Sequence, residues 1–316
     1  MKVNELILRY IDYRKSLGEK FQTNSTYLKS FSRAVGEAMH IKQVSAEKVA
    51  DFLYGTGPVT SAWFVKYTAL AGFYQYAISR GFTDFSPMPV DMPKRPPAFV
   101  PYIYTRTELR QLFETALTYQ KNRSHIEPYM IRMLLLMLYG TGLRLREALS
   151  LTMNNVNLPQ SIITVEQTKF YKSRLVPFGS QFAQEIARYL KWKKKQKIPH
   201  DEMSPFFYGR DNKPLNISTV EGVFSRIRAK AGIQRTDSVR YQPRLHDLRH
   251  TFAVHRLTSW YRENADVQLL LPALSVYMGH TYLSATSVYL TMTKELLQEA
   301  GKRFENYARR NDVRQT

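Results

Sequence analysis

The sequence predicts a mainly α-helical protein with a small antiparallel β-sheet, arranged in two domains. Three observations lead to this fold class. Apolar residues recur at helical spacing through most of the 316 residues, a length sufficient for two cores. A stretch with six prolines, at 86–101, interrupts this pattern. Only two short runs, SIITVEQ at 161–167 and RLVPFG at 174–179, are β-rich.

Four helices are expected in residues 1–88. The first follows the apolar stripe of VNELILRYIDYRKSLG. The second is expected to begin at a cap on Asn24 or Ser25 and to continue through TYLKSFSRAVGEAMH. The third begins at Ser45, and the fourth covers SAWFVKYTALAGFYQYAIS and ends near Gly81. Four short helices of this kind form a compact bundle.

A linker is predicted at 89–103, because closely spaced prolines favour an extended, semi-rigid chain. Lys94 and Arg95 give this segment positive charge, so it could follow a nucleic-acid backbone. The predicted domains are therefore 1–88 and 104–316.

The second domain opens with a capping box, Thr105 and Glu108, before an amphipathic helix. The next helix, at 126–139, is apolar on all sides and is expected to be buried. The two β-rich runs flank TKFYKS and predict a hairpin. Further helices are expected at 180–197, 218–232 (with a capping box at Ser218 and Glu221), 246–262, 272–278 and 284–290, followed by an amphipathic helical tail at 294–310.

The charge of the chain indicates a polyanionic partner. Lys and Arg number 46 against 26 Asp and Glu, a formal net charge of +20. The first ninety residues hold 11 Lys and Arg against 7 Asp and Glu, so most of the positive charge lies in the rest of the chain. The basic run KWKKKQK, 191–197, fits a solvated helix end as well as a DNA contact.

The absence of cysteine excludes a disulfide scaffold, cysteine-ligated zinc and thiol catalysis. No signal-peptide pattern and no apolar run long enough to span a bilayer are present. We therefore expect a soluble protein of the cytoplasm, associated with the nucleoid and not with a membrane.

The motifs that carry chemistry point away from nucleotide and metal cofactors. The sequence has no G-x-x-x-x-G-K-[ST] phosphate loop. In HDLRHTFAVH, His246 and His250 have the i, i+4 spacing of a zinc helix, but Asp247 stands where such a helix carries its glutamate base. A second interpretation places His246 and Arg249 together on a phosphate-facing helix surface, since i and i+3 are neighbours.

Phosphodiester transfer without a metal needs arginines to neutralise the phosphate oxygens, an acid for the leaving group and a nucleophile. A tyrosine can serve as the nucleophile, although only roughly one in a thousand is ionised at pH 7, when cations and a base stabilise its phenolate. The phosphotyrosyl ester conserves bond energy, so strand rejoining needs no ATP.

Five motifs, in order, resemble those of the tyrosine recombinases, also called phage-type integrases. They are GTGLRLREALSL, ITVEQTKFYKSRLVP, HDLRHTFA, MGH and, nine residues after the histidine, SATSVYL. The motifs cover about 105–291. The resemblance implies a catalytic set of Arg144, Lys169, His246, Arg249, His280 and Tyr289, with Glu147 in support. Lys172 competes with Lys169 for the hairpin lysine, and Lys94, Arg95, Lys172 and Arg174 are candidate DNA-binding residues.

The resemblance also implies how the residues act. Two arginines would bind the scissile phosphate, the lysine would protonate the leaving 5′ oxygen, and Tyr289 would form a 3′-phosphotyrosyl link. His246 would assist proton movement at the tyrosine, and His280 would add a hydrogen bond to the phosphate. Arg146 is the competitor of Arg144, and Tyr282 has the wrong spacing for the nucleophile. No metal and no nucleotide cofactor is implied.

The implied organisation is an N-terminal helical core-binding (SAM-like) domain that clamps double-stranded DNA, and a tyrosine-recombinase catalytic domain with a helical tail. The protein would be a tetramer on its recombination sites and a monomer in solution, with accessory DNA-bending or regulatory proteins. Its role would be integration, transposition or resolution of a mobile element. The alternatives are a type IB topoisomerase and a DNA-binding accessory protein with an inactive site.

Overall fold

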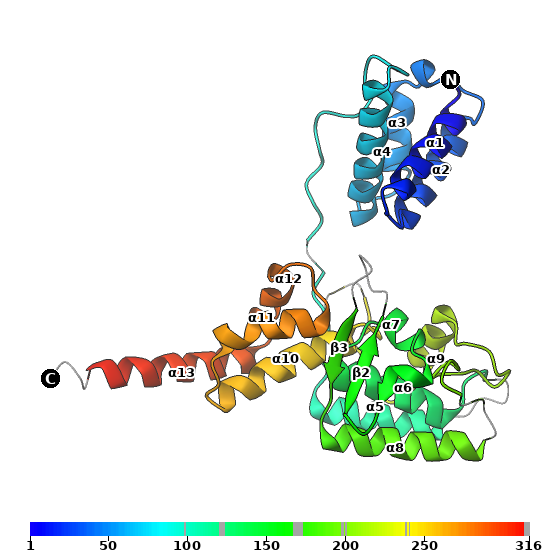
Figure 1. The fold of residues 1–316 in the computed structure, drawn as a ribbon. Coiled ribbons are helices and arrows are strands. Elements are labelled where there is room, and N and C mark those ends of the chain that lie inside the picture. Colours follow the sequence, from blue (N-terminus) through cyan, green and yellow to red (C-terminus); the bar gives the residue numbers. More distant parts are fainter. Residues whose placement is uncertain are drawn as a thin grey trace. The chain divides into compact units, whose positions relative to one another are not determined.

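The computed structural model describes residues 1–97, 99–119, 124–166, 173–196, 199, 201–237, 239 and 241–312, and only the backbone of 306–312. The chain divides into two compact units, Met1–Phe99 and Val100–Thr316 (Figure 1). Helices dominate both units, and the one sheet in the described part of the chain has three antiparallel strands. The fold class expected from the sequence is therefore confirmed.

The N-terminal unit is a bundle of four helices: α1 (Val3–Ser16), α2 (Gln22–Val35), α3 (Ala46–Tyr54) and α4 (Ser61–Ser79). Their apolar faces form one core, in which Leu6, Phe31 and Phe73 have no exposed surface. α3 begins next to the expected position, and the Ser45 hydroxyl caps it by accepting from the Lys48 N–H. The cap expected for α2 is wrong: this helix begins after Phe21, whose φ is 40°, so Asn24 and Ser25 lie within its first turn.

The proline-rich segment packs partly on α4. The Tyr67 hydroxyl donates a hydrogen bond to the Pro89 carbonyl over 3.3 Å. The Arg95 guanidinium lies 4.7 Å from the centre of the Phe64 ring, a cation–π contact. This segment therefore belongs to the N-terminal unit, which extends to Phe99. Lys94 and Arg95 are both exposed.

The C-terminal unit is built around the buried helix α6 (Pro128–Thr141). The expected capping box is present at the start of α5 (Arg106–Thr118), where Thr105 and Glu108 bond each other's backbone N–H groups. The other helices of this part are α7 (Leu145–Leu149), α8 (Ser180–Lys195) and α9 (Ile217–Lys230). Asn216 caps α9, so the box expected at Ser218 and Glu221 is wrong.

The two β-rich runs pair as expected. Strands β2 (Ile162–Val165) and β3 (Arg174–Pro177) are antiparallel, with Ile163 opposite Val176 and Val165 opposite Arg174. A third strand, β1 (Val156–Asn157), pairs with β2. It was not predicted, because two residues show no alternation. The register places Arg174 at the end of β3 that faces the site described below.

A second apolar cluster joins α10 (Asp247–Arg262), α11 (Val267–Met278), α12 (Ser284–Ser287), the 3₁₀ turn η3 (Val288–Thr291) and α13 (Lys294–Asp312). α11 begins earlier than expected, because Asp266 caps it, and it contains Pro272. Leu296 anchors the start of α13, with no exposed surface. Among the described residues, no helix is long and apolar enough to cross a membrane.

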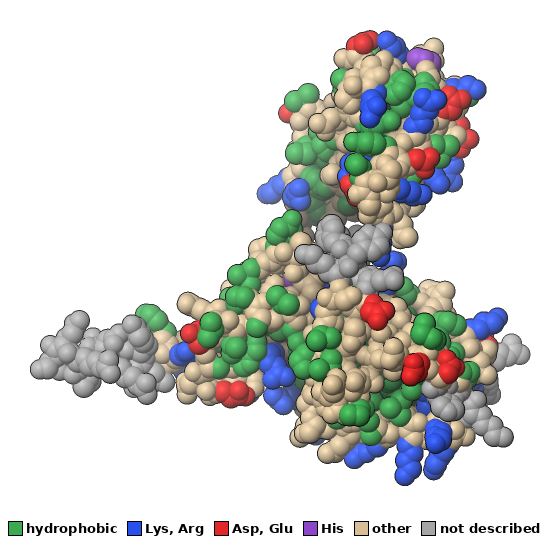
Figure 2. Space-filling view, in the orientation of Figure 1, with side chains coloured by type: hydrophobic (Ala, Val, Ile, Leu, Met, Phe, Trp, Pro, Cys, Tyr) green, Lys and Arg blue, Asp and Glu red, His purple; other side chains and the backbone are tan. Residues whose placement is uncertain are grey.

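The basic run at the end of α8 is only partly solvated. Lys191, Lys194 and Lys195 are exposed, and Figure 2 shows Lys and Arg side chains gathered along this helix. Lys193 is instead buried, and its ammonium donates to the carbonyls of Pro205 and Phe206. Lys193 continues the buried stripe of Ile186 and Tyr189. At this position the run is therefore neither a solvated helix end nor a DNA contact.

Candidate active site

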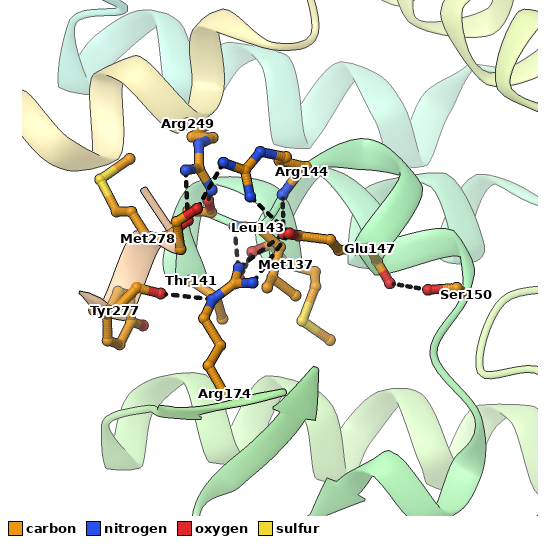
Figure 3. Close-up of polar contacts among 12 residues, drawn as sticks. Met137, Thr141, Leu143, Arg144, Glu147, Ser150, Arg174, Arg249, Tyr277 and Met278 are labelled. Carbon is orange, nitrogen blue, oxygen red and sulfur yellow. Dashed lines mark hydrogen bonds and ion pairs between the residues drawn. The ribbon is translucent and has the colours of Figure 1, made fainter. Parts of the chain in front are cut away.

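Two helix C-termini build the centre of the site. α6 ends at Gly142 and α11 ends at Gly279, with φ of 63° and 68°, the left-handed conformation that glycine adopts most easily. The last carbonyls of a helix have no partner within it and carry its negative dipole end. Here these carbonyls accept hydrogen bonds from arginines, as Figure 3 shows.

Three arginines from different elements meet at these carbonyls: Arg144, Arg174 and Arg249. Arg144, at the start of α7, donates from Nη2 to the Gly279 carbonyl over 2.9 Å. Arg174, on β3, donates from Nε to the Tyr277 carbonyl over 2.9 Å. Arg249, on α10, donates to the carbonyls of Gly142 and Met278. The carbonyls thus offset part of the repulsion among three guanidinium groups.

Glu147 joins two of the arginines through charge-assisted hydrogen bonds. Its carboxylate accepts from Arg174 at 2.8 and 3.0 Å and from Arg144 Nη1 at 2.8 Å. Burial alone would raise the pKa of Glu147, but the hydrogen bonds and charge of Arg174, aided by Arg144, lower it from 4.5 to about 2. The carboxylate is therefore ionised and fixes both arginines.

The arginines differ in their access to a ligand. Arg249 is 2% exposed, and burial, together with the charge of Arg144, lowers its pKa to about 10, so it stays protonated near neutral pH. The Arg174 side chain is 9% exposed and bonded to protein acceptors. The Arg144 side chain is 37% exposed, which makes it the arginine of the three that a ligand reaches most readily. Arg146, its competitor in the sequence, is exposed and lies outside these contacts.

Tyr289 lies beside this cluster. It is on η3, is 3% exposed, and its hydroxyl is 3.1 Å from His250 Nδ1. Burial raises the pKa of Tyr289, while the charges of Arg249 and Arg144 and a hydrogen bond with Arg249 act in the opposite direction. The residue is thus a phenol held among cations that would stabilise its phenolate. Tyr282, by contrast, is 74% exposed.

Two further histidines, His280 and His246, lie near Tyr289 and His250. The His280 ring stacks at 6.1 Å from the Tyr289 ring, and its Nδ1 is 2.7 Å from the Thr286 hydroxyl. The His246 ring meets the His250 ring edge to face at 4.9 Å, although part of His246 is exposed. Burial and the nearby arginines lower the pKa values of His246 and His280 to about 4, so both are neutral near pH 7.

The structure brings together Arg144, Glu147, His246, Arg249, His280 and Tyr289, six of the residues expected from the sequence. Their catalytic roles stay predictions. Lys169 and Lys172 lie outside the described residues. Arg174 was expected at DNA, but its guanidinium is bound to Glu147 and Tyr277, so a DNA contact would require those bonds to open.

His250 is the site residue that the sequence analysis passed over. It was considered as half of a zinc pair with His246 and as part of a phosphate-facing helix surface, but not as a partner of the tyrosine. Among the described residues, no group of three His, Asp or Glu side chains is placed to hold a metal ion. The signal was the helical phase: His246, Arg249 and His250, at i, i+3 and i+4, share one face of α10. That phase places His250 on the side of the tyrosine.

The arrangement combines fixed positive charge, a partly open arginine and a phenol within hydrogen-bond distance of an imidazole. These are the elements that electrostatic and nucleophilic catalysis at a phosphate would use. On a helical scaffold with a three-stranded sheet, they are features of a recombinase-type enzyme.

Comparison with known proteins identifies the family. Residues 104–295 match the model of the phage integrase family. A putative integrase/recombinase, y4rB, of Sinorhizobium fredii (strain NBRC 101917 / NGR234) is 30% identical over 306 residues, covering 95% of this chain and 96% of the relative. Tyrosine recombinase XerC of Bacillus subtilis (strain 168) is 30% identical over 239 residues, 74% of this chain and 71% of the relative.

Solved structures share the fold. The Tn1549 transposon integrase in complex with a circular intermediate DNA superposes with a TM-score of 0.70 at 16% identity, covering 96% of this chain and 99% of that chain. A lambda integrase dimer bound to a COC′ core site superposes with a TM-score of 0.63 at 17% identity, covering 90% of this chain and 97% of that chain. The chain belongs to the phage integrase family, the tyrosine recombinases, and is an enzyme of the site-specific recombinase and integrase class.

Proposed function

We propose that this enzyme cuts and rejoins double-stranded DNA at specific sites through a covalent 3′-phosphotyrosyl intermediate on Tyr289. The observation that carries the proposal is the position of the Tyr289 hydroxyl beside Arg249, within a cluster of three arginines. Charge-assisted hydrogen bonds from guanidinium groups neutralise a phosphodiester and the charge that develops on it.

In the proposed cleavage step, Arg144 and Arg249 bind the non-bridging oxygens and His280 supports them. The Tyr289 oxygen attacks phosphorus and gives its proton to a neighbouring histidine, the P–O5′ bond breaks, and a 3′-phosphotyrosyl ester forms. The leaving 5′ oxygen takes a proton from Lys169, which lies outside the described residues. Attack of a 5′ hydroxyl on the ester reverses these steps and joins a strand, so the number of phosphoester bonds is conserved and neither a metal nor ATP is required.

The DNA would pass next to His246. A cavity of about 400 Å³ opens there, lined by Arg228, Arg244 and Gln242 among others. Arginines beside the reacting phosphate suit the flanking backbone phosphates, which dominate the affinity of proteins for DNA. The N-terminal unit would hold the duplex as a second clamp, with Lys94 and Arg95 as phosphate contacts.

Four protomers would assemble on two sites, as in the lambda integrase tetramer bound to a Holliday junction. The exposed side chains of α13, Leu297 and Phe304, give the tail an apolar surface for a neighbouring protomer. The mobile-element role that we propose rests on the integrases among the relatives. The protein would act in the cytoplasm at the nucleoid.

Covalent trapping tests the proposal. The chain is mixed with sheared DNA of its source strain and with a randomised duplex pool, and denaturation-resistant adducts are sequenced to define the cleaved site. The site is then built into a nicked duplex, whose short cleaved strand diffuses away and leaves the adduct. Tyr289→Phe should abolish the adduct and Tyr282→Phe should retain it. An undiminished adduct in Tyr289→Phe would overturn the proposal.

Plasmid relaxation separates recombination from topoisomerase action. A plasmid with two copies of the mapped site should recombine, and a plasmid without a site should keep its supercoils. Relaxation of both plasmids would favour a type IB topoisomerase. DNA binding with no adduct on any substrate would favour an accessory protein with an inactive site.

A further inference from the structure

His250 is the histidine in contact with the reactive oxygen. Its Nδ1 lies 3.1 Å from the Tyr289 hydroxyl, and the two rings are 5.6 Å apart at 57°. His246, to which the family resemblance assigns proton movement, contacts the His250 ring at 4.9 Å. In the described part of the chain, a hydrogen bond joins the hydroxyl to His250 and none joins it to His246.

The attack requires a destination for the phenol proton. An unperturbed tyrosine is ionised at only roughly one part in a thousand at pH 7, and burial raises the pKa of Tyr289 further. Arg249 also approaches the oxygen, but a guanidinium has no lone pair to accept a proton. His280 Nδ1 is engaged with Thr286. In the tautomer protonated on Nε2, His250 Nδ1 is therefore the acceptor in place for this proton.

The charge around His250 keeps its ring neutral before DNA binds. Burial lowers the pKa of His250 to about 3, together with the charge that His246 carries when protonated, the positive charges of Arg249 and Arg244, and the charge that His280 carries when protonated. A neutral imidazole has one nitrogen with a free lone pair. A bound phosphodiester adds negative charge next to these cations, which favours the protonated ring. Substrate binding thus makes His250 a stronger base at the moment when a base is needed.

We propose that His250 is the general base for Tyr289. The inference deepens the proposed function and rests on it. As the tyrosine oxygen bonds to phosphorus, its proton passes to His250 Nδ1, while the P–O5′ bond breaks and the leaving oxygen is protonated by the general acid. When a 5′ hydroxyl attacks the phosphotyrosyl ester, His250 returns the proton to Tyr289. Each strand transfer therefore leaves His250 in its starting state.

A second tyrosine–histidine pair, whose contacts do not include the three site arginines, provides the comparison. On the same helix, His255 Nδ1 lies 3.0 Å from the Tyr139 hydroxyl, with the rings 5.9 Å apart. This pair only satisfies two half-buried polar groups. His255→Asn is therefore the matched control for His250→Asn, since both changes place an amide near the position of Nδ1 and remove the proton-accepting nitrogen.

The experiment measures single-turnover adduct formation on the nicked duplex mapped by covalent trapping. Because general base catalysis is typically worth ~10²–10⁴-fold, His250→Asn should slow adduct formation by at least ~100-fold with little change in DNA affinity. His255→Asn should stay within about threefold of wild type. A His250→Asn rate equal to that of wild type would overturn the inference.

Replacing the nucleophile distinguishes proton removal from a folding defect. A fluorinated tyrosine with a lower pKa, incorporated at position 289, ionises without a base and should restore most of the adduct rate to His250→Asn. Lack of rescue in a folded, DNA-binding variant would contradict the base role. If wild type itself forms no adduct on any substrate, the proposed function fails. If wild type forms the adduct and His250→Asn equals it, only the present inference fails.

Discussion

Replacing Glu147 with glutamine tests whether this carboxylate holds the arginine cluster together. The substitution keeps the shape of the side chain but removes the charge that Arg144 and Arg174 share. The pKa of Glu147 falls from 4.5 to about 2 on folding, which corresponds to about 3 kcal/mol of stability near neutral pH. We therefore expect Glu147→Gln to lower the free energy of unfolding of the catalytic unit by about 3 kcal/mol at pH 7.

The destabilisation caused by Glu147→Gln should be smaller at low pH than at neutral pH. A carboxylate with a lowered folded-state pKa contributes its full stability above 4.5 and loses it as the pH falls towards 2. The difference in the free energy of unfolding between wild type and Glu147→Gln should therefore be smaller at pH 3 than at pH 7, by about 2 kcal/mol. Denaturant titrations at several pH values measure it. Trp192 and Trp260 report on the catalytic unit when Trp63, in the N-terminal unit, is phenylalanine in all variants.

Glu185 provides the control, since it also pairs with two arginines, Arg132 and Arg188. Its side chain is 21% exposed, against 10% for Glu147. Glu185→Gln should therefore cost about 1 kcal/mol or less. The reasoning is refuted if Glu147→Gln costs no more than Glu185→Gln at pH 7, or if its effect does not depend on pH.

Three further predictions concern single positions. Gly279→Ala should lower both the melting temperature and the adduct rate, because a Cβ would lie 2.8 Å from Arg174 Nη1 at a φ of 68°; thermal denaturation and the nicked duplex measure the two effects. Arg249→Lys should reduce the single-turnover adduct rate at least ~100-fold, since an ammonium cannot reproduce the fork between two carbonyls and the phosphate. Burial lowers the pKa of Lys193 from 10.5 to about 8, so the folded state binds fewer protons than the unfolded state between these values. The stability of wild type relative to Lys193→Met, measured with denaturant, should therefore rise by about 2 kcal/mol between pH 7 and pH 10.

Much of the fold follows from local signals in the sequence. The capping box at Thr105 was predicted, because a hydroxyl side chain meets nearby backbone N–H groups whatever the rest of the fold does. The hairpin was predicted from two β-rich runs that flank a polar segment. The start of α2 was not, because Phe21 adopts a positive φ that no local pattern indicates.

The site was less accessible to local reasoning. The motifs identified Arg144, Arg249 and Tyr289 as a set, but nothing in the sequence showed that the carbonyls at the end of α11 bind three arginines. Arg174 was named only as a candidate DNA-binding residue. Only the pairing of β3 with β2 and the position of Glu147 make it an internal ion pair.

Lys193 and His250 show what a helical pattern could have added. Lys193 lies seven residues after Ile186 and four after Tyr189, on the buried stripe of α8, but it stands within a run of lysines. His250 shares a face of α10 with His246 and Arg249. For Lys193, residue type was given more weight than position. For His250, the spacing was used, but it did not show that this face of the helix meets Tyr289.

The most direct test of the central claim identifies the bond between protein and DNA. The adduct trapped on the nicked duplex is digested with protease and nuclease, and the modified peptide is sequenced by mass spectrometry. The account predicts a nucleotide joined through its 3′ phosphate to Tyr289, with a free 5′ hydroxyl on the released strand. A link to Tyr282, to Tyr277 or to a residue other than tyrosine, or a 5′-phosphate linkage, would contradict it.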